Sequence, residues 1–315
     1  MSIFSNAIQR SPEARGVALG LVGVVCFSGS LPVTHVAVRE FGVIVPSFGR
    51  AVIAAVLAIV VLTATRSPLP PRELVPRLVV VSLGVVVGFP TFTALALQHA
   101  PAGHGSVVIG LLPATTAGMS ALRTGDRPPG RYWAFAALGA AAIAVLTIVN
   151  GTRDVAVGDL LLLGAVLAAG VGYTEGALLS RALGGWQTIS WAVIVALPLT
   201  VPLTIVGMGP VGFDEPVTAW LCLGYLGAVS MYFGFFAWYA GLNLGGVARV
   251  SQVQLVQPLL SLVWAWLFLH ERLKPFTVVV AVIVLCSVLG SRRALARRTG
   301  ASVVTSTRTA VRVDG

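Results

Sequence analysis

The sequence has few charged residues. Only 10% of its 315 residues are Asp, Glu, Lys or Arg, whereas 57% are hydrophobic and the mean hydropathy is +0.92. A soluble domain carries about 25% charged residues, so this chain cannot cover a folded surface with polar groups. The composition therefore excludes an ordinary soluble protein and predicts an integral membrane protein.

Motifs for catalysis and metal binding are also lacking. The sequence contains no HExxH, GxSxG, Walker A or CxxC pattern. The cysteines occur singly within apolar runs and are read as small core residues; they are Cys26, Cys222 and Cys286. We therefore expect no enzyme activity, no cofactor and no bound metal.

Long apolar runs are present instead, separated by short segments rich in Pro, Gly and charge. Ten runs have roughly the length that crosses a membrane as a helix, and they lack the alternation of β-barrel strands. They cover residues 16–37, 44–65, 76–97, 104–122, 132–149, 158–180, 187–207, 217–241, 248–269 and 275–291. The sequence thus predicts an all-α integral membrane fold with ten transmembrane helices.

The basic residues predict how these spans are oriented. With the N-terminus inside, sixteen of the 21 Lys and Arg residues fall on the cytoplasmic side, four fall outside, and one, Arg50, lies within a span. This excess places both termini in the cytoplasm, and we expect a bacterial inner (plasma) membrane. The net charge of +10 is explained in this way, without nucleic acid. His99 and His104, which flank Pro101, should lie in an outer loop near water.

The two ends of the chain lie outside the predicted spans. Residues 1–15 form a cytoplasmic N-terminus. Residues 292–315 begin with several arginines and become rich in Ser and Thr. We expect this tail to be disordered and to bind anionic lipid headgroups.

An internal repeat divides the chain into two halves. Pro113 and Pro258 are 145 positions apart, and so are Asp126 and Glu271. Each proline lies within a span, and each carboxylate follows the end of that span beside an arginine. The halves are residues 16–149 and 150–291, with five spans each. Because five is odd, the second half enters the membrane in the opposite sense, an arrangement used for alternating access.

The same residues resemble a known family. The run Phe48-Gly49-Arg50-Ala51 is similar to the second helix of an EamA domain, and stretches 110–127 and 256–273 resemble the signature of that domain. The second half keeps Glu-Arg-Leu at 271–273, whereas the first half has Asp-Arg-Pro at 126–128. The resemblance covers residues 16–291 and implies a ten-helix drug/metabolite transporter with two EamA repeats. Members of this family export amino acids, other metabolites or drugs.

Ionisable residues within spans are functional candidates because their burial in a membrane is costly. Glu175 shares a helix with small residues at positions 164, 168, 172 and 176, which permit close helix approach. It could bind a proton or a cationic substrate group, or it could reach headgroups near Arg181. Arg50 lies about 9 Å inside the second span, too far from Glu175 for a direct pair. It could cap a helix end or hold a substrate carboxylate.

The ninth span carries amides that its repeat equivalent lacks. Gln254 and Gln257 share one helix face, whereas the matching residues of the first half, Ile109 and Leu112, are apolar. Amides can hydrogen-bond polar substrates or join helices to one another. Both roles remain open.

Prolines and aromatic residues complete the candidate site. Prolines within spans free carbonyl groups, which are tolerated at membrane depth where they are buried or line a cavity; they are Pro32, Pro90, Pro113, Pro198, Pro202 and Pro258. Phe92, Tyr232 and Trp238 could line a pocket, although Trp238 and Tyr239 could instead anchor the protein at the membrane interface.

The sequence as a whole favours a secondary transporter that exports a small amphipathic metabolite, such as an amino acid, between the two halves. Proton exchange at Glu175, or the substrate gradient alone, would drive it. The alternatives are an exporter of drugs or organic cations and, from another class, an intramembrane enzyme or a scaffold.

Overall fold

A computed structural model describes residues 12–123, 125, 129–150, 153–211, 214–245, 250–272 and 274–311. Within these ranges the chain is helical, with short turns and no strand. Asp126, which we singled out as a repeat-motif residue, lies outside the described residues. An all-helical chain satisfies its backbone hydrogen bonds locally, as a lipid environment requires.

The helices follow one another with few connecting residues. In the first half they are α2 (Pro12–Ser28), α3 (Ser30–Phe41), η1 (Val45–Gly49), α4 (Arg50–Ala64), η2 (Arg72–Leu74), α5 (Val75–Val81), η3 (Ser82–Gly88), α6 (Phe89–Ala96), α7 (Ala102–Ile109), α8 (Leu112–Arg123) and α9 (Gly130–Asn150). In the second half they are α10 (Arg153–Leu183), α11 (Gly185–Val211), α12 (Val217–Gly224), η4 (Tyr225–Phe233), α13 (Gly234–Gly245), η5 (Ser251–Val256), α15 (Gln257–Leu269) and α16 (Pro275–Val311).

Seven continuous or nearly continuous helical stretches in the described residues are long and apolar enough to cross a membrane. Three further apolar helices are shorter, at Gly130–Leu146, Val253–Leu269 and Pro275–Ser291. The protein is therefore an integral membrane protein. The seven long stretches are Ala14–Phe41, Val45–Ala64, Arg72–Ala96, Ala102–Arg123, Val155–Leu183, Gly185–Val211 and Val217–Gly245.

Four of the six prolines follow a break in α-helical geometry. Pro32 comes after the interruption at Gly29, and Pro113 comes after a turn at 110–111. Pro90 follows the π-helix η3, and Pro258 follows the 3₁₀-helix η5. Proline lacks an N–H and crowds the carbonyl four residues before it, so the preceding turn departs from the α-helix.

One freed carbonyl has a visible partner. Pro32 leaves the carbonyl of Ser28 without an i+4 donor. The Ser261 hydroxyl of α15 donates to that oxygen at 2.7 Å. The break in the first span therefore joins it to α15 of the second half.

Pro198 and Pro202 differ from this expectation. Both lie inside the continuous helix α11, so they do not interrupt it. Helix α16 extends from Pro275 to Val311 and so includes most of the segment that begins at residue 292.

Small residues allow two helix pairs to approach closely. A Cβ atom added to Gly84 would lie 2.5 Å from the carbonyl oxygen of Ala168 and 3.0 Å from the Cα of Gly172, so η3 and α10 touch through their backbones. A Cβ on Gly241 would lie 2.8 Å from the carbonyl oxygen of Gly16, which shows the same closeness between α13 and α2. Close packing of small residues is a main source of helix association in membranes.

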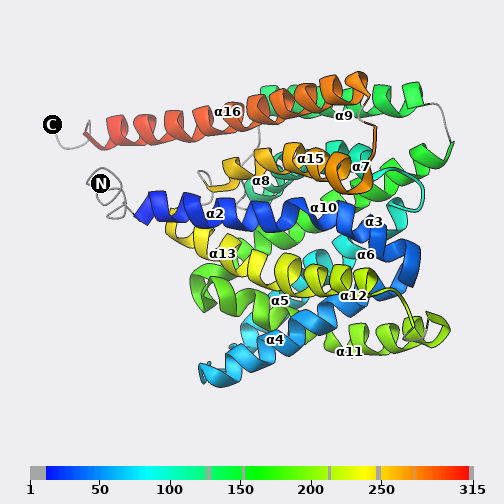
Figure 1. Ribbon diagram of the computed structural model, residues 1–315. Coiled ribbons are helices and arrows are strands. Elements are labelled where there is room, and N and C mark those ends of the chain that lie inside the picture. The colour runs from blue at the N-terminus through cyan, green and yellow to red at the C-terminus, as the bar shows by residue number, and fades with distance from the viewer. Residues whose placement is uncertain are drawn as a thin grey trace, which may run out of the picture.

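The helices are stacked in layers that run roughly parallel to one another (Figure 1). Helices α9 and α16 lie side by side at one edge of the bundle and pack mainly on each other. Helix α2 begins at the same end of the bundle at which α16 finishes. The core lies where α2, α4, α10, α11 and α13 meet.

Candidate functional site

Arg50 is a buried cation at the centre of the bundle. It is the first residue of α4, directly after the π-helix η1, and only 4% of it is exposed. One terminal nitrogen donates to the Ser230 hydroxyl at 2.9 Å, and that oxygen lies 2.6 Å from the Ser30 hydroxyl. Its Nε has no hydrogen-bond partner, and no carboxylate of the described residues forms an ion pair with it. Hydroxyl groups from α3 and η4 thus surround a positive charge.

Aromatic side chains lie near this cation: Phe27 is three residues before Ser30, and Phe235 is five residues after Ser230. The Tyr173 ring centroid lies 5.6 Å from that of Phe235 and 6.5 Å from that of Trp238. Phe27 lies 4.7 Å from Phe235 and 6.2 Å from Trp238. We call these four residues the aromatic cluster.

Two buried polar atoms, one in the aromatic cluster and one beside it, lack a hydrogen-bond partner among the described residues. The indole Nε1 of Trp238 is buried and makes no hydrogen bond, and neither does the hydroxyl of Tyr239, whose ring packs 5.6 Å from Phe235. A buried donor without an acceptor costs about 1–3 kcal/mol. Such groups mark a place where a bound molecule could complete the hydrogen bonding.

Glu175 forms a separate ionic cluster. Its carboxylate accepts a hydrogen bond from Arg77 Nε of α5 at 2.8 Å and one from Arg123 Nε of α8 at 2.5 Å. The Glu175 side chain is 9% exposed, whereas those of Arg77 and Arg123 are 33% and 54% exposed. The ionic cluster therefore ties α10 to both neighbouring helices, and its arginines reach toward the surface.

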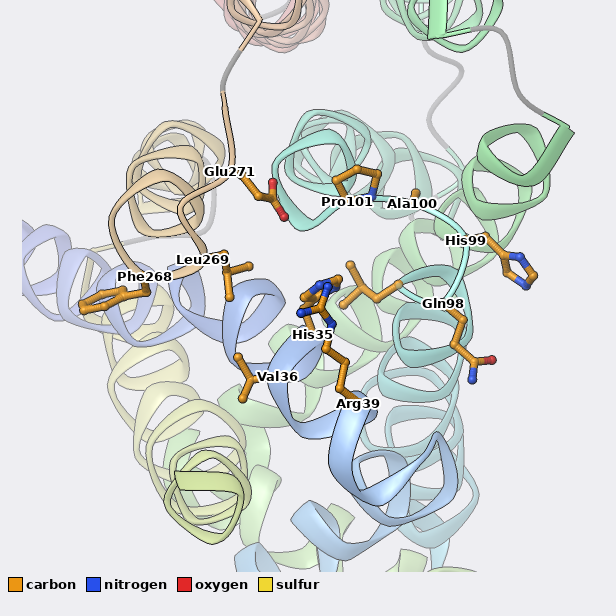
Figure 2. A pocket seen from close by; sticks show the side chains of 11 residues that line it. His35, Val36, Arg39, Gln98, His99, Ala100, Pro101, Phe268, Leu269 and Glu271 are labelled. Carbon is orange, nitrogen blue, oxygen red and sulfur yellow. The ribbon is translucent and has the colours of Figure 1, made fainter. Parts of the chain in front are cut away.

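A pocket of about 590 Å³ opens elsewhere, between α3, the 97–101 connection and the end of α15 (Figure 2). His35 and Arg39 project into it from α3, while Gln98 and His99 turn away. The Glu271 carboxylate borders the pocket on the side of α7. The pocket thus has a polar, charged lining.

The pocket and the ionic cluster lie at opposite ends of the bundle. Gly158 of α10 packs against Ala100 and His99, which line the pocket. Glu175 follows on the same helix, roughly 25 Å further along at a rise of about 1.5 Å per residue. Arg50 is associated with Ser30, which lies about 14 Å along α3 from the pocket residue Arg39. The cation is therefore between the two ends.

Two carboxylates, the half-buried Glu271 and the buried Asp159, organise α7 near the pocket. Glu271 accepts hydrogen bonds from the backbone N–H groups of Ala102 and Gly103 at 2.9 and 2.8 Å, so it caps the start of α7. Nε2 of His104 lies 2.7 Å from Oδ1 of Asp159 on α10. Both contacts join α7 to the second half.

The chain matches a known protein family over most of its length. The model of the EamA-like transporter family matches residues 14–148 and 156–293, which is most of the chain. The chain belongs to the EamA-like transporter family. This places it in the drug/metabolite transporter superfamily.

Two relatives that are similar over most of their length are also named as transporters. Over 274 residues the EamA-family chain is 43% identical to the "Uncharacterized transporter YdeK" of Bacillus subtilis, covering 87% of this chain and 96% of that protein. Over 290 residues it is 28% identical to the "Probable terminal-alkyne amino-acid exporter" of Streptantibioticus cattleyicolor, covering 89% and 94%. A solved crystal structure that is 19% identical shares the fold with a TM-score of 0.62, covering 89% of this chain and 98% of that one.

The structure of this EamA-family transporter places the expected site residues in different surroundings. Trp238 is 1% exposed and Tyr239 is fully buried, so neither of the two possible interface anchors reaches the surface of the bundle. Tyr232 is also fully buried, with its hydroxyl 3.0 Å from that of Ser190. Phe92, by contrast, is 38% exposed and packs beside Gly164 of α10.

The two amides of the ninth span are buried. Gln254 is 2% exposed and Gln257 is 5% exposed. Among the described residues, the Nε2 of Gln254 and the Oε1 of Gln257 have no hydrogen-bond partner. Pro258 follows at the start of α15 and packs beside Gly110, close to Pro113 at the start of α8. These amides leave hydrogen-bonding capacity inside the protein.

The structure gives roles to several residues that the sequence does not single out. Arg77 and Arg123 both bind Glu175, and Arg181 does not. His104 was expected near water but lies buried in α7, because Pro101 starts the helix earlier than predicted. Asp159 carried a usable signal, since it is a carboxylate within the predicted span 158–180.

Proposed function

We propose that this protein is a secondary transporter that exports a small amphipathic metabolite, such as an amino acid, by alternating access between two halves of inverted topology. The observation that carries the proposal is a pair of equivalent helix contacts. A helix of the first half packs on a helix of the second half, and the repeat equivalents of these two helices, in the opposite halves, also pack on each other. Two such related halves can rock about a site that they share.

The helices of these contacts are related by the 142–145-residue repeat. Helix α2 packs on α13. Helix α10 is the repeat equivalent of α2, and it packs on η3 and α6, which are the equivalents of η4 and α13. Helices α4 and α11 pack on each other, and so do α9 and α16. The π-helices η3 and η4 begin 143 positions apart, at Ser82 and Tyr225. The same unusual geometry therefore occurs at equivalent places.

Ten membrane crossings fit this arrangement. In Figure 1 the helical stretches run back and forth across the bundle, and the three shorter apolar helices run roughly parallel to the seven long ones. An even number of crossings puts both termini on one side, and the excess of arginine places that side in the cytoplasm of a bacterial inner membrane. The basic end of α16 would then meet anionic lipid headgroups.

The contacts at the two ends of the bundle fit one state of the transport cycle, in which the protein is closed toward the cytoplasm and open toward the outside. The ionic cluster of Glu175, Arg77 and Arg123 holds three helices together at the cytoplasmic end, whereas the pocket opens at the outer end. The ionic cluster acts as an inner gate that is closed here. Opening it requires separation of the carboxylate from both guanidinium groups.

The charges favour an amino acid over an organic cation. A cation exporter needs a free buried carboxylate, but the charge of Glu175 is balanced by two arginines. The central charge is instead positive, at Arg50. The relative named as a probable amino-acid exporter, at 28% identity, points the same way.

Counterflow into proteoliposomes tests the function. Vesicles loaded with unlabelled amino acids, tetraphenylphosphonium or nucleotide sugars would be mixed with trace labelled compound. We expect saturable accumulation of an amino acid only in vesicles that contain the protein. A protein that moves none of these classes, or whose effect does not saturate, is no transporter of the proposed kind.

Cysteine labelling tests the topology. In a variant without native cysteines, we expect Leu69→Cys to react with an impermeant maleimide only from the cytoplasmic side, and Asp214→Cys and Arg272→Cys only from outside. All three positions are at exposed turns or connections. Reaction of Arg272→Cys from the cytoplasmic side would reject the ten-helix arrangement.

A further inference from the structure

Arg50 is a buried charge that no carboxylate of the described residues neutralises. A buried charge is stable when it is paired, because the loss of hydration costs several kcal/mol. Arg50 is 4% exposed, has one hydrogen bond from its terminal nitrogens to a hydroxyl, and has an Nε without a partner. A guanidinium has five N–H donors arranged to match a carboxylate with two parallel bonds. Its surroundings are thus incomplete in the way that an anionic ligand would correct.

The hydroxyl groups around Arg50 come from both halves. Ser30 belongs to the first half and Ser230 to the second, and their oxygens are 2.6 Å apart. Arg50 donates to Ser230 at 2.9 Å. A ligand held here would touch both halves, and its binding would respond to their relative movement.

The neighbouring aromatic cluster suits the rest of an amphipathic molecule. Phe27, Phe235 and Trp238 pack on one another and are buried; Phe27 is three residues before Ser30, and Phe235 is five residues after Ser230. The unpartnered Nε1 of Trp238 adds a hydrogen-bond donor. The charge and the apolar surface therefore lie side by side, as do the two parts of a hydrophobic amino acid.

A line of polar side chains on α3 leads from the pocket toward Arg50. His35 lines the pocket, and its buried Nδ1 lacks a partner. Thr34 beside it is buried with a free hydroxyl, and Ser30 lies one turn before Thr34 on the same helix face. The distance from His35 to Ser30 along the helix is about 7.5 Å.

We propose that Arg50, with Ser30 and Ser230, binds the carboxylate of the transported molecule, that the aromatic cluster receives its apolar part, and that the pocket is its route to the outside. The ligand class is an amphipathic carboxylate, such as a hydrophobic or aromatic amino acid. This inference rests on the proposed transport function and specifies its central site.

Matched acids and amides test this assignment, because the amide removes only the negative charge. The probes are L-phenylalanine, L-leucine and L-norleucine, each beside its carboxamide, with tetraphenylphosphonium as an organic cation. Thermal stabilisation of the full chain in nanodiscs reports binding, since a ligand of the folded state raises its stability. Counterflow in proteoliposomes reports transport.

The variants separate a binding role from a structural one. Arg50→Gln should weaken binding of the acids by about ten- to hundredfold and leave the amides unchanged, since a hydrogen bond to a charged group is worth about that factor. Arg72→Gln, at an exposed arginine of η2, is the control and should bind as the unmodified protein does. If Arg50→Gln does not fold, Ser230→Ala is the second variant, with acid binding about fivefold weaker.

Each result bears on one of the two claims. Amides that bind as tightly as the acids, or acids that bind Arg50→Gln without loss, overturn the carboxylate site. Transport of tetraphenylphosphonium but of no acid also overturns it and leaves the transport function intact. A complete lack of flux for every class overturns the transport function, and the site assignment with it.

Discussion

The imidazole Nε2 of His104 lies 2.7 Å from Oδ1 of Asp159, with both residues 6% exposed. The contact joins α7 of the first half to α10 of the second, close to the outer pocket. Two titratable groups are thus buried together where the halves meet. A membrane protein retains such groups inside its bundle when they pair with each other or serve function.

We expect His104→Ala to lower the free energy of unfolding by about 1–3 kcal/mol, because it leaves the Asp159 carboxylate buried without this partner. The double variant His104→Gln with Asp159→Asn should recover part of the loss through an amide–amide hydrogen bond. Thermal unfolding in detergent measures both. A double variant that recovers none of the loss would argue against a stabilising contact between these two side chains.

Glu271→Ala should destabilise the protein by about 0.5–2 kcal/mol, the usual cost of losing a cap on a helix N-terminus. The reason is the loss of acceptors for the N–H groups of Ala102 and Gly103. The neighbouring exposed residue gives the control, Arg272→Ala, which should change little. Hydrogen exchange of the first turn of α7 should quicken in Glu271→Ala alone, and unchanged exchange would argue against capping.

Glu175→Gln should open the proposed inner gate more often, because a neutral amide holds two guanidinium groups less strongly than a carboxylate does. A cysteine at Thr116 of α8, near Thr174, reports this opening. Its alkylation from the cytoplasmic side, in a background without native cysteines, should become several times faster in Glu175→Gln. Glu73→Gln, at an exposed carboxylate of η2, is the control, and equal rates in both variants would remove the gate role.

The same Glu175→Gln variant addresses proton coupling. If protons are exchanged at Glu175, its transport loses all dependence on pH. Because two arginines already balance the charge of Glu175, we expect transport by the variant to keep whatever pH dependence the unmodified protein has. Counterflow across a series of external pH values decides the matter.

Gly84→Ala should destabilise the protein by about 1–3 kcal/mol, the range for forcing an extra methyl group into a packed interior. Its Cβ would lie 2.5 Å from the carbonyl oxygen of Ala168. Gly224→Ala is a matched control in α12, where nothing lies within 4 Å of the added Cβ. That control should gain stability by about 0.5–1 kcal/mol from better helix propensity. A loss as large at Gly224 as at Gly84 would exclude close packing as the cause.

The sequence predicted local features better than contacts. Apolar runs revealed the helices, and Pro32, Pro90, Pro113 and Pro258 revealed breaks, because both depend on neighbouring residues. Pro198 in α11 shows that a proline need not end a helix when its surroundings support the helix.

Contacts between distant residues could not be predicted. Glu175 binds partners that are 98 and 52 positions away, and Asp159 binds one that is 55 positions away. Hydropathy fixes helix depth only to within a few residues, whereas a hydrogen bond requires agreement within about 0.3 Å. The lack of a carboxylate partner for Arg50 among the described residues was likewise beyond prediction, since it depends on the placement of side chains that are distant in sequence.

The π-helices η3 and η4 have a mechanical consequence. A π-helical turn holds extra backbone compared with the 3.6 residues of an α-helical turn. If that surplus residue moved along the helix, every side chain it passed would turn by about 100° around the axis. In η4 such a turn would carry Ser230 to another face of the helix and would break the hydrogen bond that Arg50 donates to its hydroxyl. With η1, which directly precedes Arg50, the described residues contain three π-helical segments. A shift of this kind in any of them would change which side chains face the centre of the bundle while the helix still crosses it.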